Sequence, residues 1–277
     1  MKIHGFNKTT LLDYPEHLAA TIFTGGCNFR CPFCHNGGLV LDPDSQPVIP
    51  EKEVLKFLQK RRGILEGVCI TGGEPTLQPD LEDFIGKIKE MGYLVKLDTN
   101  GSRPEVLKSL LEKGLLDYVA MDIKASRENY AWAAGMNRKE APNKEPAGDV
   151  LVCKMATVSE EIQESKEMPA SMLDKVEVSV NLLKSSAIPY EFRTTVVKGI
   201  HTPEEFAPIG QWLAGCRAYY LQDYRENENI LAYCGNAQAS GDVRELKRLS
   251  SFSKEEMENM ADMARKYISK VELRGVE

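Results

Sequence analysis

TGGCNFRCPFCHN, residues Thr24–Asn36, carries three cysteines, Cys27, Cys31 and Cys34, in a Cys-x3-Cys-x2-Cys spacing. Thiolates this close together are soft ligands that select zinc or iron-sulfur clusters. A structural zinc site normally closes with four ligands from two separated pairs, but no second pair follows, and His35 is adjacent to Cys34. A cubane cluster held by three thiolates keeps one iron open. We therefore predict an open iron-sulfur site, with structural zinc as the alternative.

The remaining four of the seven cysteines are scattered, and lone cysteines are usually small buried residues. We expect that packing role for Cys69, Cys153, Cys216 and Cys234, and no further cluster. The odd cysteine count argues against a disulfide framework. The first residues, MKIHGFNKTT, lack the apolar core of a secretory signal. A reducing cytoplasm is therefore the expected location.

The composition is typical of a globular enzyme, with 277 residues, 42% hydrophobic and 27% charged. This length suits one α/β domain covering residues 1–277. No apolar run is long enough to span a membrane. A net charge of -6 argues against nucleic-acid binding, which needs clustered Lys and Arg to displace counterions. We expect neither membrane nor nucleic acid as a partner.

Short apolar runs alternate with stretches of helical period, which predicts βαβ units and a parallel sheet. The expected strands are Leu18–Thr24, Val68–Thr71, Val95–Thr99, Tyr118–Ile123, Glu191–Val197 and Ala218–Leu221. Apolar faces predict helices around Val54–Leu58, Leu81–Ile88 and Val106–Leu111, from Pro203, and over Ser253–Tyr267. Six repeats are fewer than the eight of a closed barrel, so we expect a partial parallel β/α barrel whose open side admits a bulky substrate.

Residues 137–172 interrupt this repeat with a stretch rich in Pro, Lys and Glu. We expect an insertion there, with a short strand at Val150–Val158. Two interpretations remain open, a partner-binding segment and a tolerated surface loop.

Polar residues follow the expected strands where active sites of parallel sheets collect. Gly72 and Gly73 allow close backbone approach to a ligand, and the Glu74 carboxylate suits an ammonium group. The next two strands end in Asp98-Thr99-Asn100 and Asp122-Ile123-Lys124. Each alone has an ordinary explanation, such as a turn or a solvated charge. Their joint placement predicts a site.

The cysteine spacing followed by GGEP resembles the radical S-adenosylmethionine (SAM) superfamily. More narrowly, CPFCHN, GGEPTLQPDL, KLDTNG and MDIKA resemble the activating enzymes of glycyl-radical proteins, in particular anaerobic ribonucleoside-triphosphate reductase activases. The likeness covers residues 1 to about 130 and about 176 to 275.

This resemblance implies a 4Fe-4S cluster on the three cysteines, with the free iron binding the amino and carboxylate groups of SAM. Phe33 matches a position against the adenine, and Gly72, Gly73 and Glu74 match the segment at the methionine amino end. The positions implied around the SAM carboxylate are Asp98 and Asp122, with room for a monovalent cation, and the cationic Lys124. Further cofactor-pocket candidates are Asn100, Arg193 and His201; for the last two a structural salt bridge or surface role is an equal alternative.

The implied reaction passes one electron into the SAM sulfonium and leaves a 5'-deoxyadenosyl radical, which removes hydrogen from a glycine Cα of a partner. Anaerobic ribonucleotide reductase is the favoured partner, and a low-potential protein such as flavodoxin or ferredoxin the expected electron donor. Asp13 resembles an element thought to meet the glycine loop, although Tyr14 and Glu16 replace both glycines of its Asp-Gly-Pro-Gly form; a turn cap is the alternative. A small-molecule substrate, another glycyl-radical enzyme, and an electron-transfer or zinc protein sharing only the cysteines remain alternatives.

Overall fold

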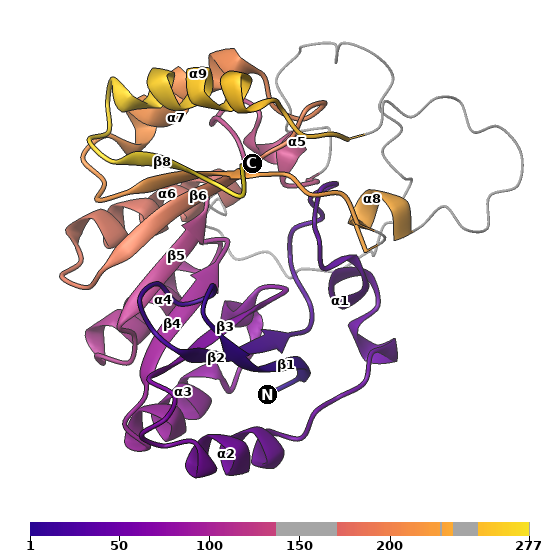
Figure 1. The fold of residues 1–277 in the computed structure, drawn as a ribbon, viewed down its shortest axis with the longest axis vertical. Coiled ribbons are helices and arrows are strands. Elements are labelled where there is room, and N and C mark those ends of the chain that lie inside the picture. Colours follow the sequence, from indigo (N-terminus) through magenta and orange to yellow (C-terminus); the bar gives the residue numbers. More distant parts are fainter. Residues whose placement is uncertain (137–170, 228, 235–248, 277) are drawn as a thin grey trace, which may run out of the picture.

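A single eight-stranded sheet organises the molecule, with strands in chain order from β1 to β8 (Figure 1). The computed structural model describes residues 1–136, 171–227, 229–234 and 249–276, and the structural statements below concern these residues. β1 is antiparallel to β2, and every later neighbouring pair is parallel. The strands are β1 (Ile3–Thr10), β2 (Ala19–Thr24), β3 (Gly67–Gly72), β4 (Leu94–Thr99), β5 (Tyr118–Asp122), β6 (Tyr190–Val196), β7 (Tyr219–Asp223) and β8 (Val271–Arg274).

The expected partial barrel is confirmed. The sheet curves without closing, because β1 and β8 are its two edges and do not pair with each other in the described part of the chain. The six strands expected from the sequence correspond to β2 through β7. The two edge strands were not expected, and they extend the sheet beyond the six predicted repeats.

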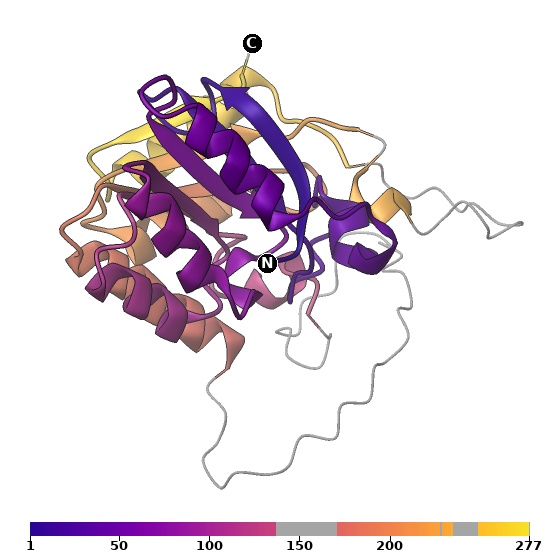
Figure 2. The ribbon, with the colours of Figure 1, turned by 90° about the horizontal axis from the view of Figure 1, so that it is seen from below.

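Helices cover the outer face of the sheet. They are α2 (Glu51–Lys60), α3 (Leu81–Glu90), α4 (Pro104–Glu112), α6 (Met172–Ser185), α7 (Phe206–Leu213) and α9 (Lys254–Arg265). In Figure 2 the helices α2, α3, α4 and α6 lie together on one side of the strands. Short α1 (Gly37–Leu41), α5 (Tyr130–Ala133) and α8 (Leu231–Cys234) lie instead beside the carboxyl ends of the strands (Figure 1). This arrangement leaves those ends accessible to a ligand.

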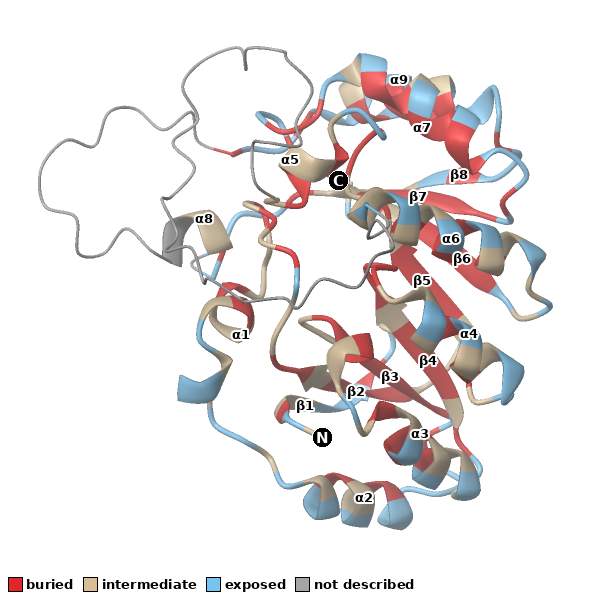
Figure 3. Ribbon diagram, turned by 180° about the vertical axis from the view of Figure 1, so that it is seen from behind, coloured by how far each residue is buried: buried red, intermediate tan, exposed pale blue. Residues whose placement is uncertain are grey.

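Local sequence signals explain where several helices begin and end. Ser171 and Ser253 each cap a helix through a reciprocal capping box, with Asp174 and Glu256 respectively. Gly92, just beyond α3, has a φ of +89°, a conformation that glycine adopts without strain. The predicted apolar face of α3 is buried at all four positions, and the buried parts of this helix are red in Figure 3. The helix predicted from Pro203 begins as a 3-10 turn, Pro203–Glu205, that leads into α7.

The inner face of the sheet differs chemically from the outer face. Side chains alternate along a strand, so Val95 and Leu97 of β4 pack outward into the apolar core, while Lys96 and Asp98 point inward. Arg193 of β6 and Asp122 of β5 also point inward and pair with one another. The interior of the partial barrel therefore carries charge, and the apolar core lies between sheet and helices.

Most of the expected insertion lies outside the described residues, including the strand expected at Val150–Val158. Its last two residues, Ser171 and Met172, cap and begin α6, a helix that the sequence had not led us to expect. Cys153 and the side chain of Cys234 also lie outside the described part, whereas Cys69 and Cys216 are buried as expected. No helix within the described ranges is both long enough and apolar enough to cross a bilayer.

Candidate active site

The cysteine loop, residues Thr24–Asn36, leaves the carboxyl end of β2 and is fixed by backbone contacts to the next strand end. The Gly73 N–H donates to Thr24 O at 2.9 Å, and the Glu74 N–H donates to Gly26 O at 2.8 Å. A Cβ on Gly73 would lie 2.0 Å from Gly26 O, and one on Gly72 would lie 2.4 Å from Thr24 O. Both glycines are therefore required by the approach of the cysteine loop itself.

Two short helices hold the loop from its other side. The Arg30 N–H donates to Ala134 O beyond α5 at 2.9 Å, and the Leu231 N–H of α8 donates to Cys34 O at 2.9 Å. A Cβ on Gly135 would lie 2.0 Å from Arg30 O. The position of the three cysteines is therefore fixed by contacts with segments that are far from them in the sequence.

The three cysteine side chains line one cavity of about 210 Å³ at the carboxyl ends of the strands. Burial raises the pKa of Cys27 to about 11 and that of Cys31 to about 12. Thiols this reluctant to ionise in the free protein lose their protons when a metal binds. Within the described ranges, no three Cys, His, Asp or Glu side chains converge as ligands of one ion. A cubane needs no such convergence, since each of its cysteines binds a different iron.

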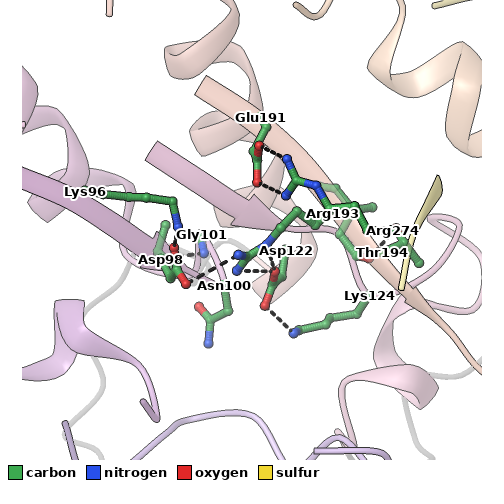
Figure 4. A network of polar contacts seen from close by, with 12 residues as sticks. Lys96, Asp98, Asn100, Gly101, Asp122, Lys124, Glu191, Arg193, Thr194 and Arg274 are labelled. Carbon is green, nitrogen blue, oxygen red and sulfur yellow. Dashed lines mark hydrogen bonds and ion pairs between the residues drawn. The ribbon is translucent and has the colours of Figure 1, made fainter. Parts of the chain in front are cut away.

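A continuous row of charges runs across three strands, as drawn in Figure 4, and all of its members except Lys96 line the same cavity as the cysteines. Lys96 pairs with Asp98 Oδ1, and Arg193 Nη1 lies 3.3 Å from Asp98 Oδ2. Arg193 Nη2 is also 2.9 Å from Asp122 Oδ1, and Lys124 Nζ is 2.9 Å from Asp122 Oδ2. We call Lys96, Asp98, Arg193, Asp122 and Lys124 the charge row.

The row keeps its members ionised despite burial. Burial acts to raise the pKa of Asp122, but Arg193 and Lys124 outweigh it and hold that pKa well below its usual range. Burial likewise acts to lower the pKa of Lys124, and Asp122 more than reverses the effect. With three cations and two anions, the row carries a net charge of about +1. Its open end, Lys124, therefore favours an anionic group in the cavity.

This pairing removes the reason for expecting a monovalent cation. That expectation came from the resemblance, and it assumed that the Asp98 and Asp122 carboxylates would otherwise repel a third one, the carboxylate of SAM. Instead the Arg193 guanidinium lies between them and compensates both. The residues present do not fit an additional cation at this position.

Glu74 does not line the cavity, contrary to its expected place beside an ammonium group. Its side chain is fully buried, and its oxygens accept from the Thr76 N–H at 3.1 Å, the Thr99 hydroxyl at 2.8 Å and the Asn100 N–H at 2.6 Å. Burial raises the pKa of Glu74, and these donors act against that rise. With its lone pairs used in this way, Glu74 joins the ends of β3 and β4.

His201 also lies outside the cavity lining, although it was a candidate for the cofactor pocket. The Val197 N–H donates to His201 Nδ1 at 3.0 Å, so the ring proton lies on Nε2, which donates to Lys124 O at 2.8 Å. Burial lowers the His201 pKa and favours this neutral form. The ring packs 5.9 Å, between centroids, from Phe33, which does line the cavity. His201 thus positions two cavity residues without facing the cavity.

Asp13 is likewise absent from the cavity lining, so the structure does not bring it together with the cysteines. It lies in the connection between β1 and β2, where Thr21 donates to its carboxylate at 2.5 Å. The neighbouring Tyr14 is buried, with its ring 4.9 Å from that of His17 and 6.0 Å from that of Tyr118.

The other sequence candidates do line the cavity, namely Phe33, Gly72, Gly73, Asp98, Asn100, Asp122, Lys124 and Arg193. Three participants escaped the sequence reasoning. Lys96 is the buried partner of Asp98, Thr195 follows Arg193 on the inner face of β6, and Asn36 donates to Gly72 O at 2.8 Å. The two-residue period of strands would have identified the first two, since each lies two positions from a candidate.

Comparison with known proteins gives this site a context. Residues 21–144 match the family model described as the Radical SAM superfamily. A Methanocaldococcus jannaschii protein, provisionally named a glycyl-radical enzyme activating enzyme, is 28% identical over 276 residues, covering 99% of this chain and 96% of that protein. The 7,8-dihydro-6-hydroxymethylpterin dimethyltransferase of the same organism is 32% identical over 136 residues, covering 44% of this chain and 26% of that protein.

Among solved structures, SuiB of Streptococcus suis bound to S-adenosylmethionine superposes with a TM-score of 0.57 at 12% identity. The match covers 90% of this chain and 48% of SuiB, so this chain spans about half of that protein, and the likeness concerns the fold alone.

The radical SAM family implies a 4Fe-4S cluster and SAM, and the cavity fits both groups. Three thiols that line one cavity, one of them buried and two partly buried, are the donor type that iron-sulfur clusters require. Lys124 lines the same cavity and can bind a carboxylate. The cavity lining therefore agrees with the sequence match, in which residues 21–144 of this chain resemble the Radical SAM superfamily.

Proposed function

We propose that this radical SAM protein is an activase that generates a glycyl radical on a partner enzyme, with anaerobic ribonucleoside-triphosphate reductase as the favoured partner. One observation carries the proposal. The relative provisionally named as such an activating enzyme aligns with 99% of this chain, whereas the pterin methyltransferase aligns with 44%. A match over almost the whole of both chains is more informative about the substrate than a match over part of each chain.

In this proposal Cys27, Cys31 and Cys34 hold the 4Fe-4S cluster. Two N–H groups already point at one of these sulfurs, since the Phe29 N–H lies 3.4 Å from Cys27 Sγ and Asn100 Nδ2 lies 3.7 Å from it. Hydrogen bonds to ligand sulfurs stabilise negative charge and tune the reduction potential of a cluster. Asn100 therefore acts on the cluster, which refines its expected role in the pocket.

The charge row orients SAM. Lys124, at the cationic open end of the row, attracts the SAM carboxylate. Arg193 keeps the row together by pairing with both Asp98 and Asp122. Phe33 offers an aromatic face to the adenine, and the strand end at Gly72 and Gly73 forms the adjoining wall. When bound, the cluster and SAM supply the chemistry, a one-electron cleavage that yields a 5'-deoxyadenosyl radical able to take hydrogen from a glycine Cα.

The open barrel suits a polypeptide substrate. A glycine within a protein loop must enter with its flanking residues, and a barrel whose edge strands, β1 and β8, do not pair with each other in the described part of the chain is suited to admit such a segment. Asp13 remains a candidate contact for that segment on the strength of its sequence match. A low-potential donor such as flavodoxin or ferredoxin would deliver the electron, and we place both the protein and its partner in the cytoplasm.

The proposal is tested by anaerobic reconstitution of the protein with iron and sulfide, followed by incubation with SAM, a reductant and the candidate reductase. Electron paramagnetic resonance should then detect a glycine-centred radical on the reductase. Protein with Cys31→Ala, treated identically, is the matched control and should give no radical. SAM cleavage without a glycine signal on several glycyl-radical enzymes would reject the activase function and favour a small-molecule substrate.

A further inference from the structure

The charge row has no vacant carboxylate oxygen. Asp98 Oδ1 accepts from Lys96 and Asp98 Oδ2 faces Arg193 Nη1 at 3.3 Å. Asp122 Oδ1 accepts from Arg193 Nε at 2.9 Å, and Asp122 Oδ2 accepts from Lys124 at 2.9 Å. Each of the four oxygens therefore already faces a cationic nitrogen of the chain itself (Figure 4).

These contacts are largely buried, so the electrostatic attraction between the charges is strong. The side chains of Lys96, Asp98 and Arg193 are 3%, 15% and 14% exposed, whereas those of Lys124 and Asp122, at the open end of the row, are 17% and 30% exposed. Charges in such a setting are screened far less than surface pairs. A further cation would enter a row that already has one excess positive charge, and it would find no carboxylate oxygen without a cationic partner.

We propose that Arg193 is a built-in counter-ion that makes SAM binding by this protein independent of monovalent cations. The guanidinium is tethered to β6, so no entropy of capturing a free ion is lost, and its planar fork contacts two carboxylates at fixed geometry. Arg193 is in this sense a positioning residue, because it holds Asp98 and Asp122 together and thereby sets the place of Lys124.

The same geometry predicts how the row would change without Arg193. Arg193→Gln leaves two cations and two anions, and it frees one oxygen of each carboxylate to face a space vacated by the guanidinium. Two carboxylate oxygens and an amide oxygen are hard ligands that suit K⁺ or Na⁺. The variant should therefore acquire a cation requirement that the native protein lacks.

The first measurement is the melting temperature of the metal-free chain, under anaerobic conditions, in chloride salts of K⁺, Na⁺ or bulky tetramethylammonium at equal ionic strength. We expect native protein and Arg193→Lys to melt within about 1 °C in all three salts, and Arg193→Gln to gain about 2 °C or more in K⁺ or Na⁺. Arg265→Gln is the matched control, because Arg265 also lies between two carboxylates, Glu258 and Asp262, but on the exposed surface of α9. It should show no cation-dependent gain.

The second measurement is the dissociation constant of SAM for the cluster-loaded protein by anaerobic calorimetry, and this arm rests on the proposed function. We expect native affinity to change by less than about twofold between the salts, and that of Arg193→Gln to be at least about fivefold weaker in tetramethylammonium than in K⁺. The melting arm does not depend on SAM, so it separates failure of this inference from failure of the proposed function.

Two results would overturn the inference. One is a native protein that gains melting temperature or SAM affinity in K⁺ or Na⁺ as Arg193→Gln does. The other is an Arg193→Gln protein that melts cooperatively yet responds to none of the cations. If Arg193→Gln does not fold, native protein and Arg193→Lys still decide, because cation sensitivity in either contradicts the inference and insensitivity of both supports it.

Discussion

Adding one methyl group at Gly73 should displace the cysteine loop. The new Cβ would lie 2.0 Å from Gly26 O and 2.7 Å from Gly26 C. Ordinary contact requires about 3.5 Å, so the Gly26 backbone would have to retreat by about 1 Å or more. That movement strains the hydrogen bond from the Glu74 N–H to Gly26 O, now 2.8 Å long.

We estimate the cost from these two effects. Overpacking against backbone typically costs about 1–3 kcal/mol, and weakening one backbone hydrogen bond adds about 0.5–1.5 kcal/mol. An alanine also lowers the conformational entropy of the unfolded chain, which stabilises the folded protein by about 0.4–1 kcal/mol and offsets part of this cost. Gly73→Ala should therefore lower the free energy of unfolding by about 0.5–4 kcal/mol. The displaced loop should also bind less iron on reconstitution.

Gly86→Ala is the matched control, since Gly86 lies within α3 and its added Cβ would meet nothing within 4 Å. Alanine is the better helix former, so this variant should gain about 0.5–1 kcal/mol and bind iron normally. Anaerobic urea denaturation measures the stabilities, and colorimetric iron and sulfide determination measures the cluster. A Gly73→Ala protein with native stability and a full complement of iron would refute the steric argument.

Three further changes test other parts of the account. Cys31→Ala should lose cluster iron and SAM cleavage, whereas Cys216→Ala, at a buried cysteine that does not line the cavity, should retain both. Retention of the cluster by Cys31→Ala would show that the ligand is assigned wrongly. Glu74→Gln should lower the free energy of unfolding by about 1.5–3 kcal/mol, because a buried carboxylate that accepts from several donors becomes an amide with one acceptor oxygen. Denaturant titration measures this change, and an unchanged free energy of unfolding would mean that these contacts are weak. Arg274→Gln should lower the free energy of unfolding by about 2–3 kcal/mol at pH 7, because Glu191 is 1% exposed and loses both contacts to Arg274, at 2.6 and 2.7 Å. The 33% exposure of Arg274 keeps this loss moderate. Burial acts to raise the Glu191 pKa, but Arg274 holds that pKa below its usual range, so the stabilisation is present above about pH 4.3 and fades as the pH falls through the folded value. The deficit of the Arg274→Gln variant should accordingly shrink in acid, and a deficit that is constant from pH 7 to pH 3 would contradict this sign.

The sequence was sufficient for the parts of the fold that repeat. Buried strands such as β3, flanked by helices with clear apolar faces, have a strong local signal. β1 lacks one, because its central residues are partly exposed and do not alternate cleanly, and β8 has only four residues at an edge. The beginning of α6 was hidden because it follows directly on the stretch interpreted as an insertion.

In the candidate site, too, some features could be predicted from the sequence and others could not. Residues at strand ends could be identified because parallel strands bring their carboxyl ends together. The actual partners of Glu74 and His201 could not, since they depend on contacts between segments about 25 and 77 residues apart in the chain. The place of Arg193 between two carboxylates is also a consequence of strand order, with β6 next to β5 and one strand removed from β4.

The central claim is that the three cysteines hold a cluster with one iron left open to SAM. The most direct measurement combines iron and acid-labile sulfide analysis of anaerobically reconstituted protein with electron paramagnetic resonance of the reduced protein before and after SAM is added. We predict about four irons and four sulfides per chain and a spectrum that changes when SAM binds. Tightly bound zinc without iron, or a cluster whose spectrum is indifferent to SAM, would contradict the claim.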